Sequence, residues 1–395
     1  MTDTAQARSL SVRVVLTVGI GLVVPSLPAF LIGATAAQVR DDLGVSEVVL
    51  GAAVAVLYIA GAAAAPFTGI LADRRGARTS IALGSMVSAG AMTGIALFAE
   101  RWGGLMILMA CAGVGIALVD PGLTRLVAGS VPAGRRGMVF GIKEASIPLA
   151  TMVAGFAVPT IAVTVGWRWV FAVGLVPFAA VMLLLATAGP SPRDAAPAAA
   201  VGSGPQHSPG RTATLALALG AALASMAATG ISVFLTDSAV SAGLSQSYGG
   251  FLLGVASVVG VVVRIASGML ADRRPEAATA LMPWMLVAGS VTMLLGATGT
   301  AVLLEVGAVG AIAGGWGWTA LFFLTLVRAD PLRPGAVAGI GLSGLAIGNA
   351  LGPIVFGALA QSVSYSAAWV LAAAAAASAA GAMYAGGRLL AVPSS

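Results

Sequence analysis

Charged residues are scarce in this chain. Only 9% of its 395 residues are charged, whereas 59% are hydrophobic, and soluble domains carry about 25% charged residues. A water-soluble fold could not cover its surface with so few charges, so the composition excludes a soluble globular protein and predicts a chain that lies in a lipid bilayer. The net charge of +6 does not indicate nucleic acid as a partner, because the basic residues separate apolar runs instead of clustering with aromatic residues.

Reactive side chains are also rare. The single cysteine, Cys111, lies within an apolar run, which excludes an internal disulfide, and His207 is the single histidine. No His, Cys, Asp or Glu cluster has metal-ligand spacing, no nucleophile and base pair is evident, and no phosphate-binding Gly-x4-Gly-Lys-Ser/Thr loop occurs. These absences argue against an enzyme and against a metal or other cofactor, and they leave an ion gradient or the solute itself as the energy source.

Long apolar runs fill most of the chain. A membrane-spanning helix needs about 20 mainly apolar residues, and the charged or Gly/Pro-rich breaks divide the sequence into twelve such stretches: 12–36, 47–71, 79–99, 104–128, 138–164, 168–188, 213–236, 247–271, 278–300, 303–327, 335–361 and 366–388. A Pro, Ser, Gly and Ala-rich segment, 189–212, separates the sixth from the seventh. We therefore predict an all-α membrane protein with six-helix bundles at 1–188 and 213–395, joined by a linker at 189–212.

The distribution of arginines predicts the orientation in the membrane, because cytoplasmic loops are enriched in Lys and Arg. If both termini are cytoplasmic, thirteen arginines lie inside and three lie outside. Those inside are Arg8, Arg13, Arg74, Arg75, Arg78, Arg135, Arg136, Arg193, Arg211, Arg273, Arg274, Arg333 and Arg388, and those outside are Arg40, Arg101 and Arg168. We expect a monomer in the cell membrane with cytoplasmic termini.

One phrase occurs twice at the ends of apolar runs. Residues 69–75 read Gly-Ile-Leu-Ala-Asp-Arg-Arg, and residues 268–274, half a chain length later, read Gly-Met-Leu-Ala-Asp-Arg-Arg. The repeat indicates two related halves, each with a helix that leaves the membrane into a short charged turn. A duplicated bundle of this kind is typical of a transporter.

The first copy resembles the signature loop between helices two and three of the major facilitator superfamily, Gly-x-Leu-Ala-Asp-Arg-x-Gly-x-Arg. The matching residues are Gly69, Leu71, Ala72, Asp73, Arg74, Gly76 and Arg78. With twelve spans and the repeat, the resemblance covers the whole chain and implies two pseudo-symmetric six-helix bundles that move a solute by alternating access.

The resemblance also implies a gate. Asp73 would contact helix eleven as a latch, and Arg74, Arg78 and Arg125 would complete its charge network. Helix eleven offers a matching face of small residues, Gly344, Gly348 and Gly352. The alternative is that the arginines only anchor the loop at the membrane surface. The second copy departs from the pattern after Arg274, so the sequence assigns Asp272 a weaker gating role.

Charges within apolar stretches are costly and mark function. Four of them fall in the fourth and fifth stretches: Asp120, Arg125, Lys143 and Glu144. The hairpin between these stretches places Asp120 and Lys143 at similar depth, so we predict that Lys143 pairs with Asp120 and Glu144 with Arg125. Neighbours in sequence do not face each other along a helix, so no contact is expected between Lys143 and Glu144. Glu144 and Asp120 are candidate proton sites, and Lys143 either binds solute or only neutralises Asp120.

Further candidates for solute binding lie in other stretches. Arg264 has no acid nearby in sequence, and its planar fork matches a carboxylate; the alternative is an arginine that reaches the membrane surface. The resemblance implies that Trp316 lies in the central cavity, and Tyr58 and Asn349 are further candidates.

The Gly-Pro-Gly-Gly phrase of proton-driven drug exporters is missing from the fifth stretch. We therefore expect a proton-coupled transporter of a small organic anion or polar metabolite, with proton-driven efflux of amphipathic compounds or an uncoupled facilitator as the alternatives.

Overall fold

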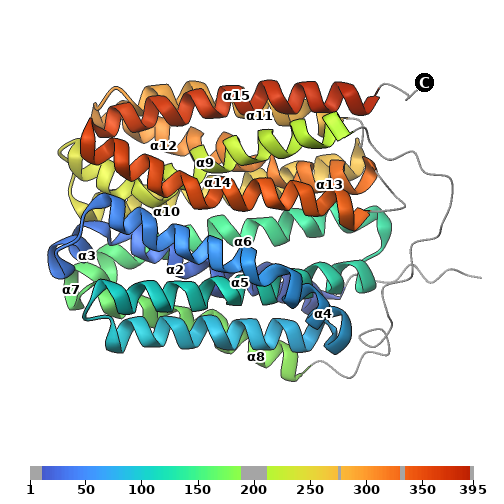
Figure 1. Ribbon diagram of the computed structural model, residues 1–395, viewed down its shortest axis with the longest axis horizontal. Helices are drawn as coiled ribbons and strands as arrows, with labels where there is room; N and C mark the ends of the chain where they lie inside the picture. The colour runs from blue at the N-terminus through green and yellow to red at the C-terminus, as the bar shows by residue number, and fades with distance from the viewer. Residues whose placement is uncertain (1–10, 188–210, 275–276, 330–333, 392–395) are drawn as a thin grey trace, which may run out of the picture.

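The computed structural model describes residues 11–187, 211–274, 277–329 and 334–391, and the regular structure within those ranges is helical throughout. The helices run side by side along one direction (Figure 1). Helices α1 to α8 occupy the lower part of this view and α9 to α15 the upper part. Residues 188–210, which include most of the predicted linker, lie outside the described part, so the domain division remains a prediction.

The first half of the chain contains eight α-helices. They are α1 (Val12–Gly21), α2 (Val23–Ala34), α3 (Ala36–Leu43), α4 (Glu47–Phe98), α5 (Trp102–Ser130), α6 (Arg136–Ala157), α7 (Val163–Val165) and α8 (Leu175–Ala186). A π-helical turn, Val158–Ala162, and a 3-10 helix, Trp167–Gly174, continue α6 and precede α8. These helices supply the first six predicted spans.

The second half contains seven α-helices. They are α9 (Arg211–Ser241), α10 (Gln246–Arg273), α11 (Ala277–Gly296), α12 (Ala301–Gly317), α13 (Thr319–Ala329), α14 (Pro334–Ser362) and α15 (Tyr365–Ala391). The α12 and α13 helices form one span with a break at Trp318.

The twelve predicted spans agree with the helices of the described residues. Eleven helical segments are long and apolar enough to cross a membrane, and one of them, Glu47–Phe98, has 52 residues. Gly76 interrupts that segment with φ 83° and ψ 164°, a backbone conformation that glycine adopts without steric penalty. The chain turns there, so α4 supplies both the second and the third predicted spans.

Large apolar side chains cover the outside of the bundle. Phe67, Ile107, Val176 and Trp284 are each at least 68% exposed. Such a surface would be unfavourable in water and is stable against lipid. The fold is that of a multi-pass membrane protein.

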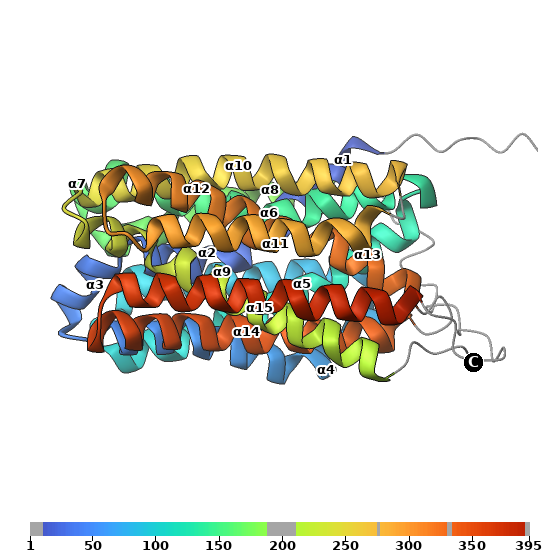
Figure 2. The ribbon, with the colours of Figure 1, turned by 90° about the horizontal axis from the view of Figure 1, so that it is seen from above.

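Both repeated phrases lie at the same end of the bundle, which we call the motif end; the opposite end, with α3 and α7, is the far end. The motif end is on the right in Figures 1 and 2, together with the end of α15. In Figure 2 the α1 helix also starts toward this side.

The two halves pack along two seams that differ in length. The α6 and α10 helices are in close backbone contact from end to end. A Cβ atom added at Gly268 would lie 2.6 Å from the Gly137 carbonyl oxygen, and one added at Gly155 would lie 2.5 Å from the Gly250 carbonyl oxygen. The α4 and α14 helices meet near the far end, where a Cβ atom at Gly357 would lie 2.8 Å from the Glu47 carbonyl oxygen. Among the described residues, these glycine contacts reach the motif end along the first seam.

Candidate functional site

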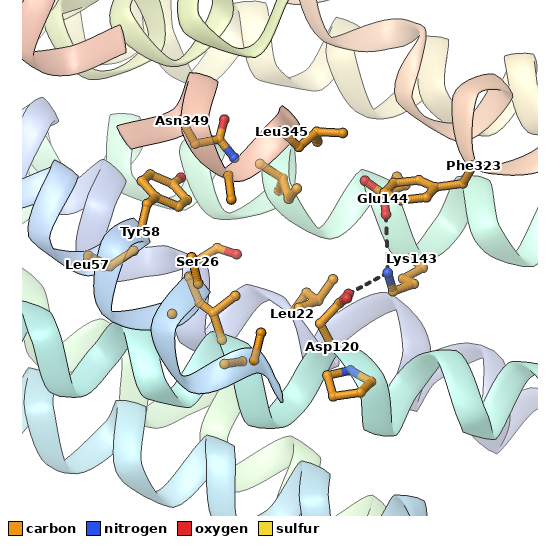
Figure 3. Close-up of a pocket in the computed structure, with 18 of the residues that line it drawn as sticks. Leu22, Ser26, Leu57, Tyr58, Asp120, Lys143, Glu144, Phe323, Leu345 and Asn349 are labelled. Atoms are coloured by element: carbon orange, nitrogen blue, oxygen red, sulfur yellow. Dashed lines mark hydrogen bonds and ion pairs between the residues drawn. The ribbon is translucent and has the colours of Figure 1, made fainter. Parts of the chain in front are cut away.

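A cavity of about 330 Å³ lies between the halves, a size within the range of ligand pockets. Its walls come from α2, α4, α5 and α6, with Leu22 between α1 and α2, on one side and from α12, α13 and α14 on the other. Figure 3 shows Tyr58, Asn349, Leu345 and Phe323 around this space, with Asp120, Lys143 and Glu144 at one side. The lining includes exposed residues of α4, Ala62 and Ala65, on the motif side of Tyr58. The cavity therefore extends toward the motif end between α4 and α14.

The charged part of the cavity is a cluster of three buried or half-buried side chains. The Lys143 Nζ atom lies 2.5 Å from Asp120 Oδ1 and 3.3 Å from Glu144 Oε1, as the dashed lines in Figure 3 show. Lys143 and Glu144 are 4% exposed at their side chains, and Asp120 is 28% exposed. Two carboxylates and one ammonium leave a formal charge of −1 when all three are ionised.

One of the three sequence-based expectations for this cluster is correct. Lys143 does pair with Asp120. The expected separation of Lys143 from Glu144 is wrong, because a flexible lysine side chain curls back to its neighbour. The expected pair between Glu144 and Arg125 is also wrong: Arg125 Nη1 lies 2.5 Å from Asp73 Oδ1, closer to the motif end.

Aromatic and amide groups form the rest of the predicted solute site. The Trp316 Nε1 donates to Ser232 Oγ at 3.0 Å, which fixes the indole ring. The Asn349 amide oxygen accepts a hydrogen bond from Thr229 Oγ1 at 2.7 Å and leaves the NH₂ group for another partner. Tyr58, Trp316 and Asn349 all line the cavity. The sequence did not single out Phe323, which also lines it and lies 5.5 Å from Lys143 Nζ, measured to the ring centroid.

Arg264 does not line this cavity. Its side chain is 0% exposed in the seam between α6 and α10, and it donates hydrogen bonds to two backbone carbonyl oxygens, those of Trp316 and Glu144. The guanidinium also lies over the Trp316 ring at 5.2 Å. The geometry therefore does not support the expectation that the Arg264 guanidinium binds a solute carboxylate.

Among the described residues, the aspartate of the first repeated turn pairs within its own half of the chain. Asp73 is 65% exposed at its side chain and pairs with Arg125 of α5, Arg74 is exposed and Arg78 is half-buried. A Cβ atom added at Gly69 would meet nothing within 4 Å. Residues 330–333, which precede α14, lie outside the described part of the chain, so the latch between Asp73 and helix eleven remains a prediction. The Gly344, Gly348 and Gly352 face packs instead on α9, against Ala218, Ala222 and Met226.

The second repeated turn makes a contact of the kind predicted for Asp73, but with α6. The Asp272 carboxylate accepts hydrogen bonds from the backbone N–H groups of Gly137, at 2.9 Å, and Met138, at 2.7 Å. These are the second and third residues of α6, which have no acceptor within their own helix. Asp272 thus caps the positive N-terminus of a helix in the other half, although the sequence assigned it the weaker gating role.

We expect the two aspartates to differ in their effect on stability. Replacing Asp272 by alanine leaves two N–H groups of α6 without an acceptor and should cost about 1 to 2 kcal/mol. Replacing Asp73 by alanine removes a largely exposed ion pair and should cost about 0 to 1 kcal/mol. Thermal unfolding of the purified variants in detergent measures both. Equal shifts in the unfolding midpoint would contradict the assigned cap.

A polar cluster closes the far end, and the sequence alone did not identify it. Arg40 Nη2 lies 3.4 Å from Asp237 Oδ2, and Arg40 Nη1 also contacts Glu47. The Tyr365 hydroxyl donates to Asp237 Oδ2 at 3.3 Å. Burial lowers the pKa of the Arg40 guanidinium, but Asp237, Tyr365 and Glu47 outweigh burial and raise that pKa, so Arg40 keeps its charge. In the sequence, Asp237 is noticeable only as an aspartate near the end of an apolar run. Its partner, Arg40, lies in the other half of the chain.

Among the described residues, no group of three or more His, Cys, Asp or Glu side chains is placed to hold a metal ion. The cavity presents the charged cluster and its aromatic walls. These groups can bind, orient and exchange protons with a bound molecule.

Comparison with solved structures identifies the same fold. The chain superposes on a D-xylose-proton symporter with a TM-score of 0.73 and 17% sequence identity, over 95% of this chain and 98% of the symporter. It also superposes on a bacterial homolog of the human lysosomal transporter Spinster in an inward-facing and unoccupied conformation, with a TM-score of 0.68 and 14% identity, over 96% and 98% of the two chains. At these identities the likeness shows the fold.

Sequence comparison adds a partial match and a family. The quinolone resistance protein NorA of Staphylococcus aureus is 31% identical over 129 residues, which are 33% of this chain and 31% of NorA. The match thus spans about a third of that relative. The model of the Major Facilitator Superfamily matches residues 10–303, more than half of the 395 residues. With the repeated turns, the twelve spans and the cavity between two helical halves, this match shows that the chain belongs to the Major Facilitator Superfamily of transporters.

Proposed function

We propose that this transporter moves an amphipathic, cationic solute out of the cell in exchange for protons. The observation that carries the proposal is the cavity itself: its walls are mainly apolar and aromatic, and the charged residues among its described lining are Asp120, Lys143 and Glu144. Two carboxylates against one ammonium favour a cation over an anion. Because Arg264 binds backbone carbonyls instead of lining the cavity, the geometry favours amphipathic efflux over the transport of a small organic anion.

The charge of the cluster provides a way to couple solute and proton. With Asp120, Lys143 and Glu144 ionised, the cluster carries −1 and attracts a cation. Uptake of one proton by either carboxylate brings the cluster to zero and removes that attraction. Solute and proton therefore weaken each other's binding, and this mutual effect is the thermodynamic requirement for exchange.

The two ends of the bundle supply the access steps. In this structure the far end is closed by Arg40, Asp237 and the contact between α4 and α14, while the cavity extends toward the motif end. The arginine distribution assigns the motif end to the cytoplasm, and the Spinster homolog of similar fold is described as inward-facing. We infer that this conformation receives solute from the cytoplasm and that both termini are cytoplasmic.

The relatives support this proposal without deciding it. NorA is described as a quinolone resistance protein, which is consistent with efflux of an amphipathic compound. The D-xylose-proton symporter of similar fold couples its solute to protons. A cell-membrane location follows from the proposed use of a proton gradient across that membrane.

Transport in proteoliposomes tests the proposal. With the potential clamped, an acidic lumen should drive accumulation of tetraphenylphosphonium, because protons leave as the cation enters. Replacing Glu144 by glutamine should lower this accumulation about tenfold, the factor that 1.4 kcal/mol of lost interaction produces. Glu305→Gln is the matched control, because Glu305 lies on α12 outside the cavity lining.

The sign of the gradient effect separates the alternatives. A small organic anion remains the second candidate because Lys143 lines the cavity, and protonation of both carboxylates would leave a charge of +1. An anion carried with protons, tested as lactate against protein-free vesicles, would accumulate with an alkaline lumen instead. Cation movement that does not respond to the pH gradient would indicate a facilitator, and no cation movement at all would defeat the exporter proposal.

A further inference from the structure

Arg264 contacts a backbone carbonyl that the sequence itself leaves without a donor. In an α-helix the carbonyl of residue i accepts from the N–H of residue i+4. The residue four after Glu144 is Pro148, which lies inside α6 and has no N–H group. The Glu144 carbonyl therefore has no partner in its own ladder, and it accepts the hydrogen bond from Arg264 Nη1 instead.

The second contact of Arg264 lies at another break in regular structure. The α12 helix ends at Gly317 and α13 begins at Thr319. Arg264 Nε donates to the Trp316 carbonyl oxygen at 3.1 Å. Ser267, one turn further along α10, donates to the next carbonyl oxygen, that of Gly317, at 3.2 Å. Two side chains of α10 thus satisfy successive carbonyl groups at the break.

Both bonded residues belong to the proposed transport site. Glu144 carries one of the two carboxylates around Lys143, and Trp316 forms part of the cavity wall. They lie in opposite halves of the chain, and Arg264 lies between them with 0% of its side chain exposed. A buried carbonyl without a donor is costly within a membrane, so the bond to the Glu144 carbonyl resists separation. The Trp316 carbonyl also accepts from Thr319 Oγ1 at 3.1 Å.

We propose that Arg264 is a positioning residue. Its hydrogen bonds to the Trp316 and Glu144 carbonyl oxygens, which we call the joint, hold the Glu144 carboxylate and the Trp316 indole in register across the cavity. The proposal assigns Arg264 no contact with solute. It rests on the proposed function only in treating Glu144 and Trp316 as parts of the transport site. The joint itself follows from Pro148, from the interrupted α12 to α13 span and from the fork geometry of arginine, which presents several donors in one plane.

A double-mutant cycle between Arg264 and Pro148 tests the joint without a transport measurement. Arg264→Met should lower the midpoint of thermal unfolding of the purified protein by about 5 °C. Pro148→Ala restores an N–H donor to the Glu144 carbonyl, so the same Arg264→Met change should shift the midpoint by about half as much in the Pro148→Ala background. Arg264→Lys, whose ammonium cannot bridge two carbonyls in one plane, should give an intermediate shift. Equal shifts in both backgrounds would overturn the joint.

Two further readouts separate a positioning role from a purely structural or solute-binding one. The emission attributed to Trp316, taken as the difference between parent and Trp316→Phe, should move to longer wavelength in Arg264→Met. In tetraphenylphosphonium transport the same variant should lower kcat about tenfold while KM changes less than about threefold. An increase in KM with kcat unchanged would show that Arg264 binds solute and would overturn the proposal. If the parent moves no cation at all, the proposed function fails, whereas the unfolding cycle and the emission shift still decide the role of Arg264.

Discussion

Replacing Gly268 by valine is expected to prevent assembly of the protein, whereas the same change at Gly69 should leave folding intact. The two glycines hold the same place in the repeated phrase, but their surroundings differ. A Cβ atom at Gly268 would lie 2.6 Å from the Gly137 carbonyl oxygen and 3.1 Å from Gly141 Cα, whereas one at Gly69 would meet nothing within 4 Å. Backbone cannot yield as a side chain does, so α6 and α10 would have to separate, at a cost of about 3 kcal/mol or more.

The comparison between the two glycines controls for helix propensity. Both substitutions place the same β-branched residue near the motif end of a helix, so the intrinsic penalty cancels. The measurement is the yield of monodisperse protein in detergent together with its unfolding midpoint. Loss of folding in both variants, or in neither, would contradict the unequal packing of the two turns.

Gly69→Val also carries information about the conformation that this structure does not show. The latch predicted for Asp73 requires close approach of the first turn to a neighbouring helix in another conformation. If that conformation forms during transport, Gly69→Val should lower transport while its unfolding midpoint stays within about 1 °C of the parent. Unchanged transport would indicate that the first turn only anchors the loop.

Replacing Lys143 by methionine is expected to abolish transport and to destabilise the protein strongly. The change removes the cation that lies 2.5 Å from Asp120 and 3.3 Å from Glu144. Two carboxylates are then left at a site where the Glu144 side chain is 4% exposed. Removing one partner of a buried ion pair costs about 3 to 5 kcal/mol, because the remaining charge has no compensation. Without Lys143 the cluster carries a formal charge of −2, so one proton no longer removes its attraction for a cation and the proposed exchange loses its coupling.

A second variant separates the charge effect from a loss of packing. The double change of Lys143→Met and Asp120→Asn removes one charge of each sign and restores the formal charge of −1. It should recover most of the unfolding midpoint that the single change loses. A double variant that is as unstable as Lys143→Met would show that the lysine stem, and not its charge, stabilises this part of the bundle.

Several features of the protein could be predicted because they depend on short stretches of sequence. The spans follow from the length of apolar runs, and the pairing of Lys143 with Asp120 follows from the length of one hairpin. The candidates Tyr58, Trp316 and Asn349 do line the cavity. The pair between Glu144 and Arg125 was wrong, because sequence gives the depth of a charge but not the rotation of its helix.

The sequence by itself determined the family, the twelve spans and the two charged turns, since local composition and a repeated phrase record them directly. Only the tertiary structure decided which helix each turn contacts, which carbonyls Arg264 binds and which residues close the far end. Those contacts join the two halves: Asp272 to α6, Arg264 to Glu144, and Arg40 to Asp237. A duplicated sequence offers the same phrase on both sides, and the relative placement of two packed bundles decides which helix each copy contacts.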